Sequence, residues 1–333
     1  MNIMFYILCF SLAFTQSESH EFAGTKVANW LKIENGTRAI GMSGAHTASG
    51  RGVASIQYNP ASITHVSGTE LYYNQSKYIA GITKNVLGYG LKLSPYDYFG
   101  MNLFYLNSGD IEVTTERTPT GTGEMYQVLN LCLSTAYARK VGDNLRVGAT
   151  VKIVREDIYT AYMNSYAFDF GGTYTFKPPV PIFPKLTLGL SFSNIGPEVK
   201  FYGQGLDQTV STDLSVDEKL SRVSESFQLP MVFRFGVSTP SPLSIAGNNI
   251  LVALDLVKPD DNFVSLNSGF EYSWKDMVYI RSGYHLGHDS AGLSAGFGLK
   301  WRAIELDLAY TDYQIFNSNN FSNPYQMGLI FSF

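Results

Sequence analysis

The chain has 333 residues, with 24 Lys and Arg against 28 Asp and Glu, which gives a formal net charge of −4. Charged residues make up 16% of the sequence, well below the roughly 25% of a soluble domain, whereas aromatic residues reach 14%. This composition argues against a nucleic-acid partner, which requires clustered cations, and against a disordered chain. The 2 cysteines exclude a disulfide scaffold and a cysteine-rich zinc module. A large β-rich domain or a membrane barrel remains.

The first residues have the features of a secretory signal peptide, which we place at residues 1–17. Residues 3–14 (IMFYILCFSLAF) form an apolar run that is too short for a membrane-spanning helix, which needs about 20 residues. Small residues at Ala13, Thr15 and Ser17 offer cleavage positions. The alternative is a buried helix at the start of the domain. Removal of the signal would leave Cys132 as the remaining cysteine, so no intrachain disulfide is expected.

Beyond residue 68, apolar residues alternate with small or polar ones, the period of a β-strand. In residues 325–333 (YQMGLIFSF) the odd positions are large and apolar, and the even ones include Gln326, Gly328 and Ser332. Turn signals such as Gly142-Asp143-Asn144 separate such segments. Fourteen strands are predicted, at about 69–77, 87–93, 98–106, 126–138, 144–156, 165–176, 185–194, 229–238, 249–257, 264–274, 277–285, 291–300, 303–312 and 324–333.

These strands fit a membrane barrel better than a soluble β-sandwich, the alternative. The face opposite the apolar one is rich in Gly, Ser and Thr with scattered charges, which suits a polar lumen while the apolar face meets lipid. The long connections, at about 107–125, 195–228 and 311–323, all follow odd-numbered strands. Outer-membrane barrels have short periplasmic turns and long external loops. The sequence therefore predicts a 14-stranded antiparallel transmembrane β-barrel over residues 69–333.

The same pattern predicts the surroundings of the barrel. An even strand number places both termini on one side, the periplasm of a Gram-negative bacterium, with the barrel in outer-membrane lipid. Aromatic residues near the strand ends are candidates for the two interfacial girdles. These candidates are Tyr272, Trp274, Tyr279, Trp301, Tyr310 and Tyr325.

Residues 21–68 lack the alternation. Glycines and other small residues in 38–45 (RAIGMSGA), and the Asn-Pro pair in 58–63 (YNPASI), suit backbone threaded through a tight space. These blocks, together with residues 281–284 (RSGY), 293–301 (LSAGFGLKW) and 304–310 (IELDLAY), resemble the PorV/PorQ family, relatives of the FadL outer-membrane transporters. The resemblance spans residues 22–333. Residues 47–53 (TASGRGV) depart from it by lacking the acidic residues often found there.

The resemblance implies an N-terminal hatch, residues 18–68, that plugs the lumen. Matching residues would either fix the fold of the hatch, which we favour, or contact substrate; they are Arg38, Gly41, Gly44, Asn59, Pro60 and Ala61. Charges of mixed sign on the polar face would point into the lumen and anchor the plug by ion pairs. The candidates are Arg146, Lys152, Asp169, Arg234, Asp255, Glu271, Arg281, Lys300, Glu305 and Asp307.

Two functions follow from the resemblance. PorV-like proteins serve type IX protein secretion, which implies secretion-system components or cargo as partners. FadL-like proteins instead pass hydrophobic small molecules such as long-chain fatty acids, and this is the alternative function. The terminal Phe333 resembles the aromatic signal that the outer-membrane assembly machinery reads.

No catalytic or cofactor site is expected. Residues 292–296 (GLSAG) match G-x-S-x-G, but that motif needs a strand turning sharply into a helix, and here Ser294 lies within an alternating strand. His285, His288 and Asp289 lie at a short connection without a further ligand cluster, so we expect solvated histidines and no metal.

Overall fold

A computed structural model describes residues 24–77, 81–180, 183–211, 217–221, 224–241, 248–287, 291–313 and 325–333. The predicted signal peptide, residues 1–17, lies outside these ranges. Within them, none of the helices has the length and apolar character needed to span a membrane.

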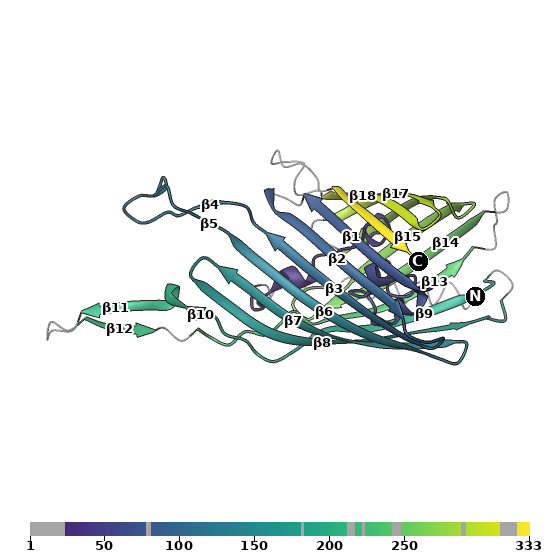
Figure 1. Ribbon diagram of the computed structural model, residues 1–333, viewed down its shortest axis with the longest axis horizontal. Coiled ribbons are helices and arrows are strands. Elements are labelled where there is room, and N and C mark those ends of the chain that lie inside the picture. The colour runs from purple at the N-terminus through teal and green to yellow at the C-terminus, as the bar shows by residue number, and fades with distance from the viewer. Residues whose placement is uncertain are drawn as a thin grey trace, which may run out of the picture.

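Fourteen antiparallel strands close into a barrel (Figure 1), which confirms the predicted fold class. They are β1 (Thr69–Lys77), β2 (Thr83–Lys92), β3 (Asp97–Asn107), β6 (Val128–Val141), β7 (Leu145–Ile158), β8 (Ala161–Phe176), β9 (Leu186–Ile195), β13 (Val232–Pro240), β14 (Asn249–Pro259), β15 (Ser265–Trp274), β16 (Val278–Leu286), β17 (Ala291–Trp301), β18 (Ile304–Tyr313) and β19 (Tyr325–Ser332). Each strand pairs with the next along the chain, and β19 pairs with β1 to close the ring. Four boundaries differ by three or four residues from the prediction. β2 begins at Thr83 instead of residue 87, β8 at Ala161 instead of 165 and β13 at Val232 instead of 229, and β6 ends at Val141 instead of 138.

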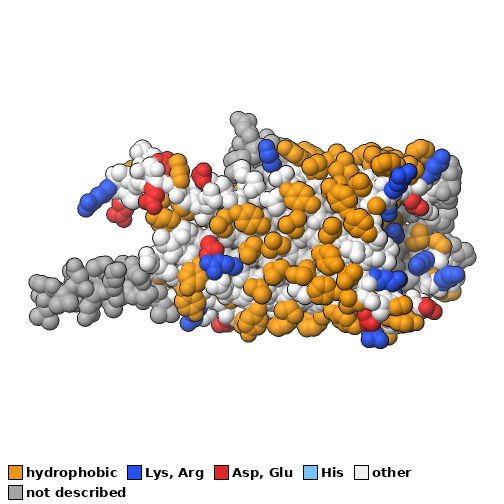
Figure 2. Space-filling model, viewed as in Figure 1, with side chains coloured by type: hydrophobic (Ala, Val, Ile, Leu, Met, Phe, Trp, Pro, Cys, Tyr) orange, Lys and Arg blue, Asp and Glu red, His pale blue; other side chains and the backbone are white. Residues whose placement is uncertain are grey.

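The alternating residues place apolar side chains on the outer face of the barrel and polar side chains on its inner face. On β18, Leu306 and Leu308 are 38% and 45% exposed, whereas Asp307 between them is 1% exposed. Figure 2 shows hydrophobic side chains over the outer wall of the barrel. Lipid offers no hydrogen bonds, so a closed ladder with this apolar belt is what a spanning sheet requires.

One aromatic residue departs from the predicted girdles. Trp274 and Trp301 are 45% and 61% exposed on the outer face. Tyr279, however, shares the inner face of β16 with Arg281, whose guanidinium carbon lies 5.0 Å from the centre of the Tyr279 ring. Residues two apart on a strand point to the same face, so Tyr279 points inward with Arg281. The prediction of an interfacial role for Tyr279 is therefore wrong.

Short hairpins extend the connections that follow odd-numbered barrel strands. The β3–β6 connection contains β4 (Ile111–Glu112) and β5 (Met125–Tyr126). The β9–β13 connection contains β10 (Tyr202–Gly203), η5 (Gln204–Leu206), β11 (Asp207–Ser211) and β12 (Asp217–Ser221). In Figure 1 these hairpins project from the end of the barrel opposite the C-terminus. The predicted loop at 311–323 falls largely outside the described residues.

The N-terminal segment, residues 24–68, lies inside the barrel (Figure 1). It contains η1 (Asn29–Lys32), α2 (Thr37–Gly41), η2 (Val53–Ser55) and η3 (Pro60–His65). The helix α2 packs against β16 to β19, η2 against β1 to β3, and η3 against β3, β6, β7 and β8. Residues 26–33 (KVANWLKI) could form a short amphipathic helix by sequence, and the structure has a four-residue 3₁₀ helix there, η1.

Replacing Leu308 with arginine should lower the free energy of unfolding from lipid vesicles by about 2–4 kcal/mol, because the charge would face hydrocarbon. Leu308→Met is the matched control, since it keeps an apolar side chain of similar volume and should cost less than about 1.5 kcal/mol. Equal losses in a denaturant titration of the two variants would contradict the outward orientation of Leu308.

Candidate functional site

Glycines on the inner wall allow the N-terminal segment to touch the strands backbone to backbone. A Cβ added at Gly296 of β17 would lie 3.0 Å from the Cα of Gly41 in α2. A Cβ at Gly148 of β7 would lie 2.7 Å from the carbonyl carbon of Pro60. Contacts this short leave no room for a side chain on the strand, so the strand needs glycine at both positions. Backbone atoms of the segment also lie close to Gly189, Gly236, Gly269 and Gly283, whereas side chains of the segment occupy the space at Gly100, Gly171 and Gly328.

Asn59 anchors the segment at the seam between β8 and β9. Its amide nitrogen Nδ2 donates to the backbone carbonyl oxygens of Thr47 (2.9 Å) and Gly172 of β8 (3.0 Å). Its Oδ1 accepts from the backbone N–H of Ala61 at 3.0 Å and so caps η3. Asn59 is fully buried. One side chain therefore fixes both the turn of the segment and its position on the wall.

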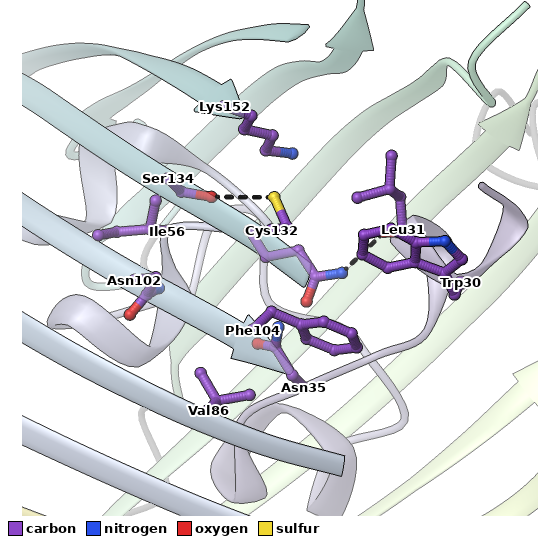
Figure 3. Close-up of a pocket in the computed structure, with 11 residues that line it drawn as sticks. Trp30, Leu31, Asn35, Ile56, Val86, Asn102, Phe104, Cys132, Ser134 and Lys152 are labelled. Atoms are coloured by element: carbon purple, nitrogen blue, oxygen red, sulfur yellow. Dashed lines mark hydrogen bonds between the residues drawn. The ribbon is translucent and has the colours of Figure 1, made fainter. Parts of the chain in front are cut away.

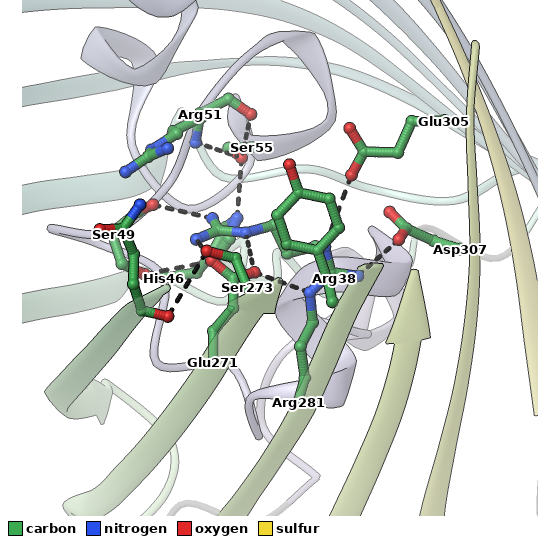
Figure 4. A network of polar contacts seen from close by, with 12 residues as sticks. Arg38, His46, Ser49, Arg51, Ser55, Glu271, Ser273, Arg281, Glu305 and Asp307 are labelled. Atoms are coloured by element: carbon green, nitrogen blue, oxygen red, sulfur yellow. Dashed lines mark hydrogen bonds and ion pairs between the residues drawn. The ribbon is translucent and has the colours of Figure 1, made fainter. Parts of the chain in front are cut away.

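A network of ion pairs joins α2 to the barrel strands β15, β16 and β18 (Figure 4). Arg38 donates from Nε and Nη2 to the two carboxylate oxygens of Glu271, at 2.7 and 2.8 Å. Glu271 Oε2 also accepts from Nε of Arg281 at 2.7 Å, and Arg281 Nη1 pairs with Asp307. Glu305 lies 3.5 Å from Arg281 Nη2. Buried ion pairs depend on every partner being present, so the network fixes α2 in one position.

The remaining predicted lumenal charges also lie on the inner face. Lys152 pairs with Asp169 at 2.6 Å. Asp255 Oδ2 accepts the backbone N–H groups of His46 (2.8 Å) and Thr47 (2.7 Å), and so holds the N-terminal segment directly. Arg234 is buried near Tyr58, while Arg146 and Lys300 are half-buried.

The remaining predicted hatch residues Gly44, Pro60 and Ala61 lie within the N-terminal segment, all buried. Gly44 has a φ of 70°, a left-handed conformation that favours glycine, and its N–H donates to Ala39 at 2.9 Å. The structure thus gives the predicted hatch residues contacts within the segment or with the wall. Phe333 is 71% exposed, and its backbone N–H and C=O pair with Thr69 at the start of β1.

The structure explains the G-x-S-x-G match at residues 292–296 and the position of His285. Ser294 is buried on the inner face of β17, where its hydroxyl contacts that of Thr311 at 3.1 Å, so it does not stand on a nucleophile turn. His285 is buried in β16 and its Nδ1 lies 3.1 Å from Asn267 Oδ1, which corrects the expectation of a solvated loop histidine. His288 and Asp289 lie outside the described residues. Within the described ranges, no group of acidic, His and Cys side chains could hold a metal ion.

Several wall residues that hold the N-terminal segment were missed from the sequence. Lys84 of β2 is fully buried and donates from Nζ to the carbonyl oxygen of Glu34. Glu70 Oε1 accepts a hydrogen bond from the backbone N–H of Val53 at 2.7 Å. Asn102 Nδ2 donates to the backbone carbonyl oxygen of Val53 at 3.0 Å. For Glu70 and Asn102 the available signal was a polar residue at an inward-facing position of a predicted strand. Lys84 gave no such signal, because the sequence predicts that β2 begins only at residue 87.

His46 is a neutral element of the segment. Burial, followed by the charge of Arg38, lowers the pKa of His46 well below its usual value. Its Nε2 lies 2.8 Å from the hydroxyl of Ser55. The ring therefore packs as an uncharged group beside the ion network.

A small cavity of about 30 Å³ lies between the segment and the wall (Figure 3). Trp30 stacks on Phe104 with ring centres 5.6 Å apart, and the Trp30 Nε1 donates to Glu156 at 2.7 Å. The lining mixes apolar side chains with polar ones: Trp30, Leu31, Ile56, Val86, Phe104 and Cys132 with Asn35, Gln57, Asn102, Ser134 and Lys152. The cavity thus brings apolar and polar groups together between the segment and the wall.

Beside Asn59, the strand register of the wall is irregular and several of its residues are glycines. Between the pairs Phe168–Ile195 and Phe170–Phe192, β9 has one more residue than β8, and Asn194 adopts a φ of 64°. On the outer face, an apolar groove of about 600 Å³ runs across β7, β8 and β9. Its floor includes Gly148, Gly171, Gly172 and Gly189, and its rim includes Phe170, Phe192 and Phe235. At this position only glycine backbone separates the outer groove from Asn59 and Pro60.

Comparisons with solved structures identify the same fold. The toluene transporter TodX of Pseudomonas putida aligns with a TM-score of 0.56 at 11% identity, covering 90% of this chain and 98% of that one. A FadL homologue of Pseudomonas aeruginosa aligns with a TM-score of 0.55 at 12% identity, covering 90% and 99%. No protein-family model and no curated protein sequence matches the chain. The chain therefore has the fold of FadL-type outer-membrane barrels.

Replacing Glu271 with glutamine should weaken the docking of the N-terminal segment by about 3–5 kcal/mol, because Arg38 and Arg281 would lose the carboxylate they share. The measurements are single-channel conductance and protease cleavage within the segment, both of which should increase. Arg139→Gln is the control: Arg139 pairs with Asp97 at 3.3 Å but is 56% exposed, so its loss should cost under about 1 kcal/mol. A Glu271→Gln barrel that stays as closed as the Arg139→Gln barrel would contradict the anchoring role.

Proposed function

We propose that this protein is an outer-membrane channel for hydrophobic small molecules, in which the N-terminal segment is a hatch within the barrel. The observation that carries the proposal is the partly apolar cavity beside Trp30, set between the hatch and the wall of a FadL-type barrel. The termini would lie in the periplasm and the hairpin-bearing end outside the cell. No catalytic step is involved.

The geometry supports a route from the cavity into the wall. Ile56, which lines the cavity, is close in the chain to Asn59, which bridges to the irregular β8–β9 seam. A displacement of Asn59 would release the Gly172 carbonyl and leave glycine backbone as the remaining barrier to the outer groove. An apolar guest would then pass from a protein cavity to a lipid-facing groove without crossing water. TodX is described as a toluene transporter and a monoaromatic hydrocarbon channel, which fits such a guest.

Binding of a hydrophobic guest in the cavity should change the fluorescence of Trp30, since its indole lines the cavity. Titration of the purified barrel with toluene and with a long-chain fatty acid is the measurement. Trp30→Phe should abolish the change, whereas Trp301→Phe, at an exposed outer position, should preserve it. A signal that survives Trp30→Phe and disappears in Trp301→Phe would indicate partition into the detergent belt and overturn the proposal.

Filling the cavity should block transport. Val86→Trp places a large side chain into the cavity and should reduce uptake of the labelled guest by cells about tenfold, a cost of 1.4 kcal/mol. Val252→Trp is the matched control, because Val252 is 39% exposed on the outer wall. Both variants must show heat-modifiable gel migration like the parent. Equal uptake by the two variants would contradict passage through the cavity.

Protein secretion of the PorV type is the second candidate function, supported by the sequence blocks at residues 38–45 and 58–63 and by the projecting hairpins. The β11–β12 hairpin would be the external recognition element (Figure 1). Deleting residues 204–225 should spare membrane insertion but abolish co-purification with secretion-system components or cargo. If the full chain is isolated without such partners while it binds toluene or a fatty acid, this second function is excluded.

A further inference from the structure

A second cavity, of about 190 Å³, lies inside the barrel at the end that carries the C-terminus. It opens to solvent and is lined by the N-terminal segment and by the ends of β7, β8, β9, β13 and β14. Three cations line it: Arg51 of the segment, Arg146 of β7 and Lys185 just before β9. No Asp or Glu is among its lining residues, although the barrel interior elsewhere pairs its charges.

These cations lack partners in the part of the chain that the structure describes. Arg51, Arg146 and Lys185 form no ion pair there, and the Nε of Arg146 is buried without a hydrogen-bond partner. The Arg51 guanidinium makes none of the contacts drawn in Figure 4. A buried guanidinium N–H without an acceptor is costly, so an acceptor supplied by a ligand would be favoured.

Neutral groups complete the lining in a manner suited to an oxyanion. Thr175 and Thr187 bring their hydroxyls within 3.1 Å of each other, and Ser49 and Ser238 add two more hydroxyls. Nδ1 of His65 lies 3.0 Å from the carbonyl oxygen of Ser62. Enclosure by protein, then the charge of Arg146, lower the pKa of His65 to about 3, so its ring adds no charge.

The difference in charge between the two ends of the molecule also favours an anion at this cavity. Lys and Arg side chains gather at the C-terminal end of the barrel in Figure 2. The turn at 177–185 there carries two lysines and no acid. The connection at 108–127, at the opposite end, carries four acidic residues and one arginine. This asymmetry raises the local concentration of anions at the mouth that holds the cavity.

We propose that the cavity formed by Arg51, Arg146 and Lys185 binds a small oxyanion, of the phosphate or phosphate-monoester class. Arginine presents paired N–H donors that match phosphate oxygens. The Ser49 hydroxyl already donates to the carbonyl oxygen of Ala45 at 2.7 Å, and Thr175 and Thr187 share one hydrogen bond, so Ser238 and one of the two threonines supply the further donors. The site is separate from the apolar cavity beside Trp30 and does not depend on the transported molecule. Bound anion would join the segment, through Arg51, to the wall, through Arg146, at the mouth of the barrel.

Isothermal titration calorimetry of the full barrel in detergent with inorganic phosphate tests the site, at constant ionic strength because screening alone weakens charge contacts. Saturable binding with a dissociation constant of about 1 mM or tighter is expected. Arg146→Gln and Arg51→Gln should each weaken binding about tenfold or more, as for loss of a charge-assisted hydrogen bond. Arg302→Gln, at the same end but stacked on Trp301 at 5.1 Å, should leave binding unchanged.

Parallel titrations with glycerol 3-phosphate and acetate distinguish the source of the anion. Tighter binding of the monoester than of inorganic phosphate would identify a phosphorylated small molecule, and the reverse would identify free phosphate. Acetate binding as tight as phosphate would overturn the phosphate assignment. No saturation by about 10 mM phosphate, or equal weakening by Arg302→Gln and Arg146→Gln, would overturn the site itself. Lys185 is exposed, so Lys185→Gln serves if either arginine variant misfolds: weaker phosphate binding is expected, and unchanged binding would overturn the site.

Discussion

Backbone hydrogen bonding in lipid is the constraint on which the rest of this structure depends. Hydrocarbon offers no partner to a strand edge, so the pairing of β19 with β1 is required for the sheet to exist in a membrane. Closure of fourteen strands also encloses an interior too wide for wall side chains alone to fill. The N-terminal segment occupies that interior, and its own polar backbone groups then need partners from the wall.

The wall meets this need in two ways. Where the segment approaches most closely, glycines such as Gly148 and Gly296 remove the side chain altogether. Elsewhere, charged and amide side chains reach the backbone of the segment, as Asp255 does at His46 and Thr47. The glycine contacts need no movement of charge to break, whereas the Arg38–Glu271–Arg281 pairs do. Asn59 itself holds the segment by uncharged hydrogen bonds, whereas α2 is held by ion pairs.

The interior separates three chemical environments along the barrel. A partly apolar cavity lies beside Trp30, a paired ion network holds α2, and unpaired cations line the mouth near the C-terminus. An apolar guest is favoured only in the first, because the other two would lose hydration or charge partners without compensation. The proposed channel and the proposed oxyanion site therefore use different parts of one lumen.

The period-two alternation by itself determined the strand number, the lipid-facing and lumenal faces, and the placement of all ten candidate charges on the inner face, because parity along a strand is a local property. Parity also places Tyr279 inward, beside Arg281, although its aromatic character suggests a membrane interface. Only the tertiary structure decided which partners meet: Lys84 with Glu34, Asn59 with Gly172, and Arg38 with Glu271. These contacts join residues 50, 113 and 233 positions apart, and depend on how a non-repetitive segment folds within a closed wall. No local pattern encodes that arrangement.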